Sequence, residues 1–202
     1  MLKQLLVDVI PFNITPTAIL ESLEKNAGRL IVQGVLQRAN AYNQNGRTYP
    51  RQILQREGDK YFKTFVKERR ALGELDHPDS SVVNLSNVSH NILEMWWEGD
   101  DLCGKVEVLG TPSGNILKEL FKAGIKLGIS SRGLGSIEEM GEGKVAVKPD
   151  FELIAFDFVS NPSTQGAFLH PMNEGKVTQK INERYDRVNA ILTDILLEIG
   201  RG

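Results

Sequence analysis

Short runs of β-branched and aliphatic residues, separated by turn-forming residues, fill the middle of this 202-residue chain. The clearest pair, "SHNILEMWW" and "DLCGKVEVLG", flanks "EGD", and this pattern predicts a β-hairpin with its tip near residues 98–101. Further strands are predicted at 29–38, in "KLGISSRGLGS" and in "KVAVKPDFELIAFDFVSNP", the last two joined by the turn-rich "EEMGEG". So many short strands favour a barrel or a sandwich over a parallel sheet.

Two segments are predicted to form helices that flank these strands. Residues 51–70 carry apolar side chains at roughly helical spacing, with Gly58 as a possible break. Residues 111–124 begin with cap-forming residues, continue with an apolar i, i+3/i+4 pattern and end at Gly124. We therefore expect an α+β fold with a mainly antiparallel, β-barrel-like core and flanking helices.

The C-terminal segment has a different pattern. Its apolar residues alternate spacings of four and three, as in the heptad seam of an amphipathic helix. These residues are Ile181, Tyr185, Val188, Leu192, Ile195 and Ile199. We predict a main domain at 1–174 and a helical tail at 175–202, joined at Gly175. This helix would either pack on its own domain or act as an oligomerising, docking or removable tail.

Composition excludes several classes of protein. A formal net charge of −2 provides no electrostatic footprint for nucleic acid. Cys103 is the single cysteine, which excludes an internal disulfide framework, and its strand-like setting favours a buried, apolar role. The opening "LLVDVIPF" is interrupted by Asp8 and Pro11, so neither a membrane span nor a signal peptide is predicted. We expect a cytoplasmic protein without a membrane or nucleic-acid partner.

Metal and nucleotide sites are not predicted either. The residues that would bind zinc are scattered, without the spacing of a known site: His77, His90, His170 and Cys103. No phosphate-binding GxxxxGK[ST] motif is present, and the glycines of "RGLGS" do not form a dinucleotide-binding turn. We expect no metal and no cofactor.

Nucleophilic catalysis is the remaining chemistry, and "GISSRG" is its candidate site. Ser130 and Ser131 end a predicted strand, and Arg132 and Gly133 follow with a positive charge and a flexible backbone that could hold an oxyanion. Alternation along the strand puts Ser131 on the apolar face and Ser130 beside Arg132, which favours Ser130 as the nucleophile. A bulge would reverse this choice, and a polar strand end without a catalytic role is the alternative.

A base and an orienting acid must come from elsewhere in the chain. In "GELDHP", His77 is either part of a surface turn or a general base. Glu74 lies three residues before it, and Asp157 lies in the apolar stretch "LIAFDFVSNP". A carboxylate in such a strand is costly to bury unless it is paired, so Asp157 either orients the base or is a solvated strand end.

Four motifs occur together in a specific order: "GELDHP", "MWWEGDDLCGKVEV", "GISSRGLGS" and "FDFVSNPS". With "NQNGRTYP" at 43–50, they resemble the prohead core proteases of tailed bacteriophages over about residues 30–170. This resemblance implies a serine endopeptidase with a fold distantly similar to that of the herpesvirus assemblins.

Position by position, the resemblance assigns the nucleophile to Ser130, the base to His77 and the third member to Asp157. In the herpesvirus relatives the third member is a second histidine, and His90 ranks below Asp157 for that role. Glu74 is the fallback orienter. Ser131, Arg132 and Gly133 are the candidates for binding the oxyanion or the substrate.

The resemblance also implies a role in capsid maturation. The protease would lie in the immature prohead within the host bacterial cytoplasm, and cleave the scaffold proteins, the major capsid protein and itself. Such proteases often favour a bulky apolar residue two places before a glutamate, so Glu198 in "ILLEIG" and Glu21 in "AILES" are predicted self-cleavage sites. The C-terminal seam makes a homo-oligomer plausible. The alternatives are an inactive prohead protein that binds scaffold, and an ester hydrolase, which no G-x-S-x-G motif supports.

Overall fold

The computed structural model describes residues 3–12, 14–76, 78 and 80–160. The predicted C-terminal helix, the domain boundary at 174/175 and Glu198 lie outside these residues. The described residues all belong to the predicted main domain.

Within the described residues, the strands form three sheets with the orders β1-β7-β10, β2-β6-β5-β4 and β3-β9-β8. The strands are β1 (Gln4–Phe12), β2 (Leu30–Arg38), β3 (Arg47–Thr48), β4 (Leu72–Glu74), β5 (Val88–Glu98), β6 (Asp101–Val108), β7 (Leu127–Gly135), β8 (Ile137–Gly141), β9 (Lys144–Val147) and β10 (Glu152–Val159). All ladders are antiparallel except the short β3–β9 pair. The mainly antiparallel α+β fold and the predicted hairpin, now β5–β6, are confirmed.

Three α-helices flank the sheets in the described part of the chain: α1 (Pro16–Lys25), α2 (Arg51–Tyr61) and α3 (Pro112–Lys122). The start of α3 agrees with its predicted cap, because Thr111 Oγ1 accepts a hydrogen bond from the Gly114 N–H at 3.0 Å. The predicted break at Gly58 is wrong. Helix α2 runs through this glycine and changes to a π-helical turn at Phe62–Val66.

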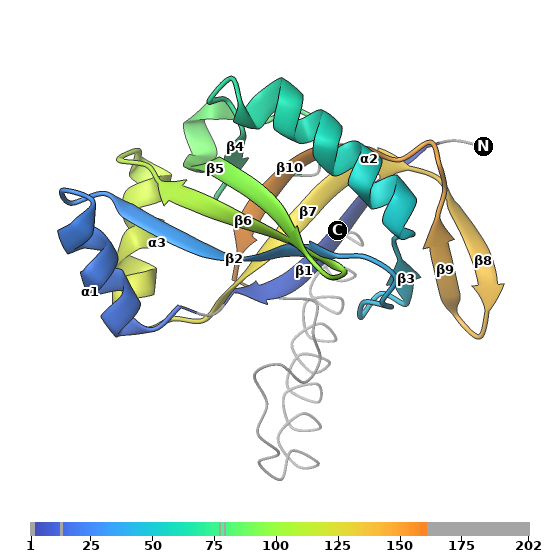
Figure 1. Cartoon of the computed structure of the whole chain (residues 1–202), viewed down its shortest axis with the longest axis horizontal. Helices are drawn as coiled ribbons and strands as arrows, with labels where there is room; N and C mark the ends of the chain where they lie inside the picture. The colour runs from blue at the N-terminus through green and yellow to red at the C-terminus, as the bar shows by residue number, and fades with distance from the viewer. Residues whose placement is uncertain (1–2, 13, 77, 79, 161–202) are drawn as a thin grey trace, which may run out of the picture. The chain divides into compact units, whose positions relative to one another are not determined.

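Several elements were not predicted, among them β1, α1 and β8, which lies where the turn-rich "EEMGEG" was expected to join two strands. Strand β1 contains Asp8 and Pro11, which interrupt the apolar pattern, but as an edge strand it tolerates a proline. Helix α1 has a readable start signal, since Thr15 Oγ1 accepts from the Ala18 N–H at 3.2 Å. Figure 1 shows α1 and α3 side by side at one end of the sheets, with the β8–β9 hairpin at the other.

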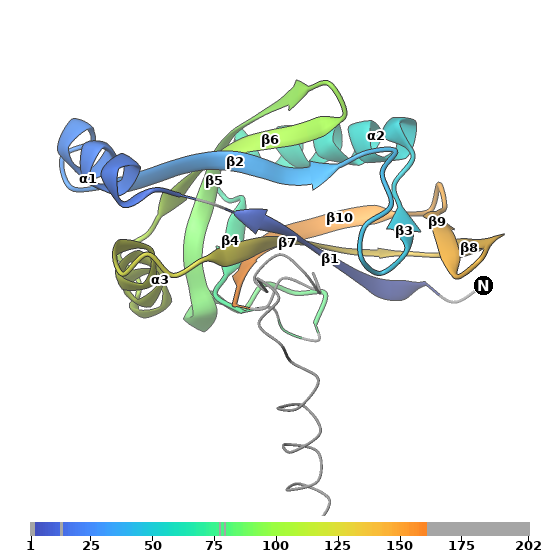
Figure 2. The same ribbon diagram turned by 90° about the horizontal axis from the view of Figure 1, so that it is seen from below.

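The core lies between two layers of strands. Figure 2 shows β2 and β6 in one layer and β1, β7 and β10 in the other. Phe158 of β10 makes edge-to-face contacts with the rings of Phe12 and Phe121, and Phe156 makes one with Tyr61. The alternate side chains of β10 therefore join this sheet to the helices, and its other face carries different chemistry.

The barrel-like core expected from the sequence is wrong in one respect, because the sheets do not close. On one side β10 approaches β4 through a single bridge between Leu75 and Phe158. On the other side no ladder joins β1 to β2. There the Phe12 ring packs on Gly34, so closely that a Cβ at Gly34 would lie 2.7 Å from the ring. Pro11 also lacks an N–H for pairing. Side chains separate these two edges and keep the barrel open.

Substitutions at two glycines test this packing, because one should lower the free energy of unfolding and the other should raise it. A Cβ on Gly73 of β4 would lie 2.0 Å from the Phe156 carbonyl oxygen and 2.3 Å from His90 Nε2. Gly73→Ala should therefore lower the free energy of unfolding by about 2 kcal/mol or more, measured by urea denaturation.

Gly58→Ala is the matched control. Its Cβ would make an ordinary contact with Leu102 at 3.5 Å inside α2. This substitution should raise the free energy of unfolding by about 0.5–1 kcal/mol. Equal effects of the two substitutions would contradict this close packing around Gly73.

Candidate active site

Ser130 and Asp157 lie directly opposite one another on β7 and β10. Directly paired residues of neighbouring strands project to the same face, so their side chains are neighbours. Both residues are fully buried. The Ser130 hydroxyl has no hydrogen-bond partner in the structure as described. Among the described residues, a serine hydroxyl free of competing bonds therefore lies beside a buried carboxylate.

The prediction that the two serines end a strand is wrong. Strand β7 pairs with β1 on one side and β10 on the other, and both ladders continue past the serines to Leu134. Gly133 lies within this strand, where a Cβ would come within 2.4 Å of the Phe151 ring. Close packing, rather than a flexible loop, thus accounts for this glycine.

Arg132 is held in a buried ion cluster with both predicted carboxylates. Its Nη2 donates to Glu74 Oε1 and to Asp157 Oδ1, each at 3.1 Å, and its Nε lies 2.9 Å from Asp157 Oδ2. Its Nη1 donates to the Ser80 carbonyl oxygen at 2.7 Å. The three charged side chains are fully buried. The guanidinium expected near an oxyanion is therefore directed at two carboxylates.

The two carboxylates have further partners. Asp157 Oδ1 accepts from the Glu74 N–H at 3.0 Å, and Glu74 Oε1 accepts from the Asn84 N–H at 3.0 Å. Glu74 Oε2 is buried and has no hydrogen-bond partner among the described residues. Burial raises the pKa of Asp157, and the Arg132 guanidinium acts in the opposite direction. Asp157 Oδ2 likewise has no hydrogen-bond partner among the described residues, beyond its ion pair with Arg132 Nε at 2.9 Å. Either carboxylate thus has an oxygen that could accept from an imidazole N–H.

His77 lies outside the described residues, but the chain on either side of it is anchored to the same two strands. The Asp76 N–H donates to the Phe158 carbonyl oxygen of β10 at 2.7 Å. Beyond it, the Ser80 carbonyl oxygen accepts from Arg132 of β7. The segment containing the predicted base is thus attached at both ends to the strand pair that carries Ser130.

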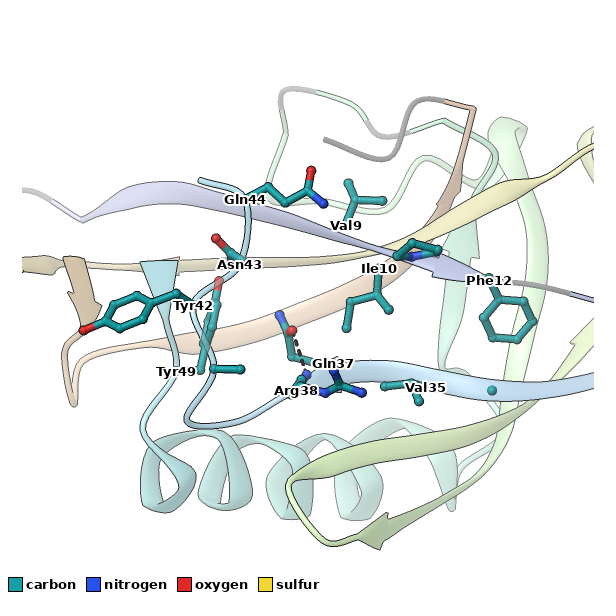
Figure 3. A pocket seen from close by; sticks show the side chains of 13 residues that line it. Val9, Ile10, Phe12, Val35, Gln37, Arg38, Tyr42, Asn43, Gln44 and Tyr49 are labelled. Atoms are coloured by element: carbon teal, nitrogen blue, oxygen red, sulfur yellow. Dashed lines mark hydrogen bonds between the residues drawn. The ribbon is translucent and has the colours of Figure 1, made fainter. Parts of the chain in front are cut away.

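Ser131 belongs to the other face of β7. Its hydroxyl accepts a hydrogen bond from Gln37 Nε2 of β2 at 2.6 Å. Gln37 lines a cavity of about 500 Å³ between β1 and β2, together with Val9 and Tyr49 (Figure 3). The predicted alternation of the two serines is therefore confirmed, and the cavity lies on the Ser131 side rather than beside the Arg132 cluster.

The motif "NQNGRTYP" clamps strand β1 through Asp8, a contact the sequence did not predict. Arg47 Nη1 donates to Asp8 Oδ2 at 2.7 Å, and Asn45 Nδ2 donates to Asp8 Oδ1 at 2.8 Å. The Tyr49 hydroxyl donates to the same carboxylate. Asp8 lies opposite Ser131 in the β1–β7 ladder, so this clamp holds the strand that borders the candidate site. The sequence signal for this contact was an aspartate within an apolar run, because a carboxylate that is buried there needs partners.

The surroundings of His90 and Cys103 indicate that both residues have a structural role. His90 Nε2 bonds to the Phe156 carbonyl oxygen at 3.0 Å, and its Nδ1 bonds to the Ser89 hydroxyl at 2.8 Å. Burial lowers the pKa of His90 to about 4, so the imidazole is neutral near pH 7. Cys103 is buried, as predicted, and burial raises the pKa of its thiol.

The residues that the structure describes contain no group of three or more His, Cys, Asp or Glu side chains arranged to hold a metal ion. None of their helices has both the length and the apolar character needed to cross a membrane.

Arg132→Met should lower the free energy of unfolding at pH 7 by about 3–5 kcal/mol, because it leaves two buried carboxylates without their cation. It also removes an interaction that lowers the pKa of Asp157. A carboxyl whose pKa is higher in the folded protein binds protons more readily when folded, so acid favours folding. Urea unfolding at pH 5 should therefore show a smaller loss than at pH 7.

Arg38→Met is the matched control. Arg38 Nη2 donates to Asp101 Oδ2 at 2.9 Å, but the Arg38 side chain is 56% exposed. Its replacement should cost no more than about 1 kcal/mol. Equal losses in the two variants, or an Arg132→Met loss that grows as the pH falls, would contradict the buried cluster.

Comparison with known proteins agrees with the resemblance seen in the sequence. A family model described as "Prohead core protein serine protease" matches residues 14–179. The "Prohead core protein protease" of Enterobacteria phage T4 is 35% identical over 145 residues, covering 70% of this chain and 68% of the relative. A solved structure of the bacteriophage T4 capsid assembly protease superposes with a TM-score of 0.70 and 28% identity, covering 79% of this chain and 99% of that one. The protein thus has a protease role in capsid maturation, and the chain belongs to the family of prohead core protein serine proteases.

Proposed function

We propose that this chain is a serine endopeptidase with Ser130 as nucleophile and His77 as general base. Its substrates are the scaffold and major capsid proteins inside the immature prohead, in the host cytoplasm. The observation that carries the proposal is the buried Ser130 hydroxyl, which has no hydrogen-bond partner among the described residues and lies directly opposite Asp157. Family membership supports the reaction class. The position of Ser130 opposite Asp157 supports the roles proposed for these two residues.

The proposed reaction is acyl transfer in two steps. Neutral His77 takes the Ser130 proton while Oγ bonds to the scissile carbonyl carbon, and the carbonyl oxygen takes the negative charge. The imidazolium then protonates the amine as the C–N bond breaks. Water, deprotonated by His77, releases the acyl group by the same steps in reverse. No cofactor takes part.

The ion cluster is proposed to stabilise the imidazolium. Two carboxylates share one guanidinium, so the formal charges of the cluster sum to one negative charge beside Ser130. Asp157 is the proposed orienter because it lies opposite Ser130, and Glu74 is the alternative because its Oε2 has no partner among the described residues. No oxyanion donor is assigned among Ser131, Arg132 and Gly133, because their backbone lies in a strand that is paired on both sides and the Arg132 guanidinium faces carboxylates.

The complete burial of Ser130 bears on the rival function. A substrate reaches this hydroxyl only when the groups that cover it move. The same burial suits the alternative of an inactive prohead protein that binds scaffold. Labelling of Ser130 separates the two possibilities.

Self-cleavage at Glu21 has a structural requirement. Glu21 lies inside α1, four residues before Lys25. The Lys25 Nζ lies 3.3 Å from Glu21 Oε2. Ile19 of the same helix is buried. Because proteases bind extended chains, we propose that a cut here follows local unwinding of α1.

Ser130→Ala should abolish both labelling by a serine-directed phosphonate and cleavage of the scaffold protein. The reason is that only Ser130 Oγ forms the covalent bond in the proposed reaction. Mass spectrometry of the labelled full-length chain gives the modified residue.

Ser131→Ala is the control, because it removes the neighbouring hydroxyl that is bonded to Gln37. It should still be labelled and should retain cleavage. Equal labelling of wild type and Ser130→Ala would overturn the assignment of the nucleophile, and cleavage by His77→Ala would overturn that of the base.

Asp157→Asn should lower kcat by about 10³- to 10⁴-fold if Asp157 orients the base, with little change in KM. The acid limb of the kcat/KM profile should also move to lower pH, because the imidazolium loses a stabilising charge. Glu74→Gln removes the other carboxylate charge of the same cluster and should move this limb by a smaller amount, because Asp157 remains to orient the base. The reverse result would assign the orienting role to Glu74.

A further inference from the structure

His90 of β5 lies at the seam between strand β10 and the sheet that contains β4 and β5. Among the described residues this seam has no ladder, only the single bridge between Leu75 and Phe158. The His90 side chain is fully buried, and its Nε2 lies 3.0 Å from the Phe156 carbonyl oxygen. The imidazole therefore bonds to β10 across a seam where the backbones make few bonds of their own.

The bond from His90 is one of two that reach the backbone of β10 on either side of Asp157. The Phe156 carbonyl, which precedes Asp157, accepts from His90. The Phe158 carbonyl, which follows it, accepts from the Asp76 N–H at 2.7 Å. On its other edge β10 pairs with β7 along the same residues. The backbone of Asp157 is thus held from both edges of its strand, and His90 supplies part of the hold on the β4–β5 side.

The surroundings of the imidazole fix its tautomer and its orientation. A carbonyl oxygen can only accept, so Nε2 carries the proton and donates to Phe156. Nδ1 is then an acceptor, and the buried Ser89 hydroxyl donates to it at 2.8 Å. The Phe158 ring packs edge-to-face on the imidazole, with the ring centroids 4.8 Å apart. The donor that reaches β10 is therefore held in one state and one direction.

Gly73 of β4 leaves the space that this bond occupies. It lies directly opposite His90 in the β4–β5 ladder, and a Cβ there would lie 2.3 Å from Nε2 of that imidazole. The next residue is Glu74, whose N–H donates to Asp157 Oδ1 at 3.0 Å. The imidazole thus lies between the backbones that carry the two carboxylates, so loss of its bond would let these backbones shift against each other.

We propose that His90 is a positioning residue, which holds Asp157 where this carboxylate can orient the His77 imidazole. The inference rests on the proposed function, because it assigns to His90 an effect on catalysis that acts through Asp157. His90 itself is fully buried and bonds to a backbone carbonyl and a hydroxyl. A catalytic group that is misplaced by about 1 Å can cost about 10²-fold in rate, so a bond beside the orienting residue should affect kcat rather than substrate binding.

His90→Leu removes the donor and keeps an apolar side chain in the core. It is assayed on a peptide that spans a scaffold cut, mapped by sequencing the new N-termini. This variant should lower kcat by about 10- to 100-fold with little change in KM. His90→Asn should show the same loss, because its short amide does not reach the Phe156 carbonyl oxygen, and it replaces the leucine variant if that variant does not fold.

His90→Gln is the conservative variant that should rescue activity. Its amide is one methylene longer than that of asparagine, so its N–H can take the place of the Nε2–H and donate to Phe156. We expect kcat near the wild-type value. A glutamine variant as slow as the asparagine variant, or wild-type kcat in the leucine and asparagine variants, would contradict the inference.

Ile92, two residues further along β5, provides the control for stability. It is fully buried in the hydrophobic core and has no polar group to bond to β10. Of Ile92→Val and Ile92→Ala, the variant whose urea midpoint is closer to that of His90→Leu is assayed on the same peptide. It should keep the wild-type kcat. An equal loss of kcat would show that lowered stability alone explains the effect of His90.

Combination with Asp157→Asn identifies the residue through which His90 acts. Once the orienting carboxylate is lost, its position no longer matters, so the double variant should have about the same kcat as Asp157→Asn alone. Losses that multiply would overturn the inference, and so would wild-type kcat in Asp157→Asn. Equal phosphonate labelling of wild type and Ser130→Ala would instead overturn the proposed function.

Discussion

The ion cluster of Arg132 with Glu74 and Asp157 is the interaction on which the candidate site depends. It joins β4, β7 and β10, and through the Ser80 carbonyl oxygen it also holds the loop that follows the predicted base. A buried arginine with two carboxylates is costly to desolvate, and replacing such a cluster by apolar residues often stabilises a protein. Its presence opposite Ser130 is therefore better explained by function and positioning than by stability.

Strand alternation is the second constraint, because it separates packing from chemistry on the same two strands. On β10, Phe156 and Phe158 pack into the aromatic core, while Asp157 between them points to the other face and belongs to the ion cluster. On β7, Ser131 bonds to Gln37 on one face and Ser130 lies opposite Asp157 on the other. Each functional side chain is thus held by neighbours that belong to the core, which leaves little freedom for its backbone to shift.

Prediction from the sequence succeeded where the pattern was local. The β5–β6 hairpin, helix α3 with its Thr111 cap and the opposite faces of Ser130 and Ser131 all follow from periodicity and capping. It failed where a distant partner decided the outcome. Strand β1 contains an aspartate that looked disruptive until Arg47 and Tyr49 supplied its partners, and strand β7 continues past the serines because strands on both sides pair with it.

The sequence by itself determined the family, the mainly antiparallel α+β fold and the residue types of the candidate triad, because these depend on motif order and side-chain period. Only the tertiary structure decided that the sheets stay open between β1 and β2, where Phe12 packs against Gly34. It alone showed that Arg132 is shared by Glu74 and Asp157, residues 83 positions apart. Such contacts depend on how separate strands meet, and no local pattern in the chain encodes that geometry.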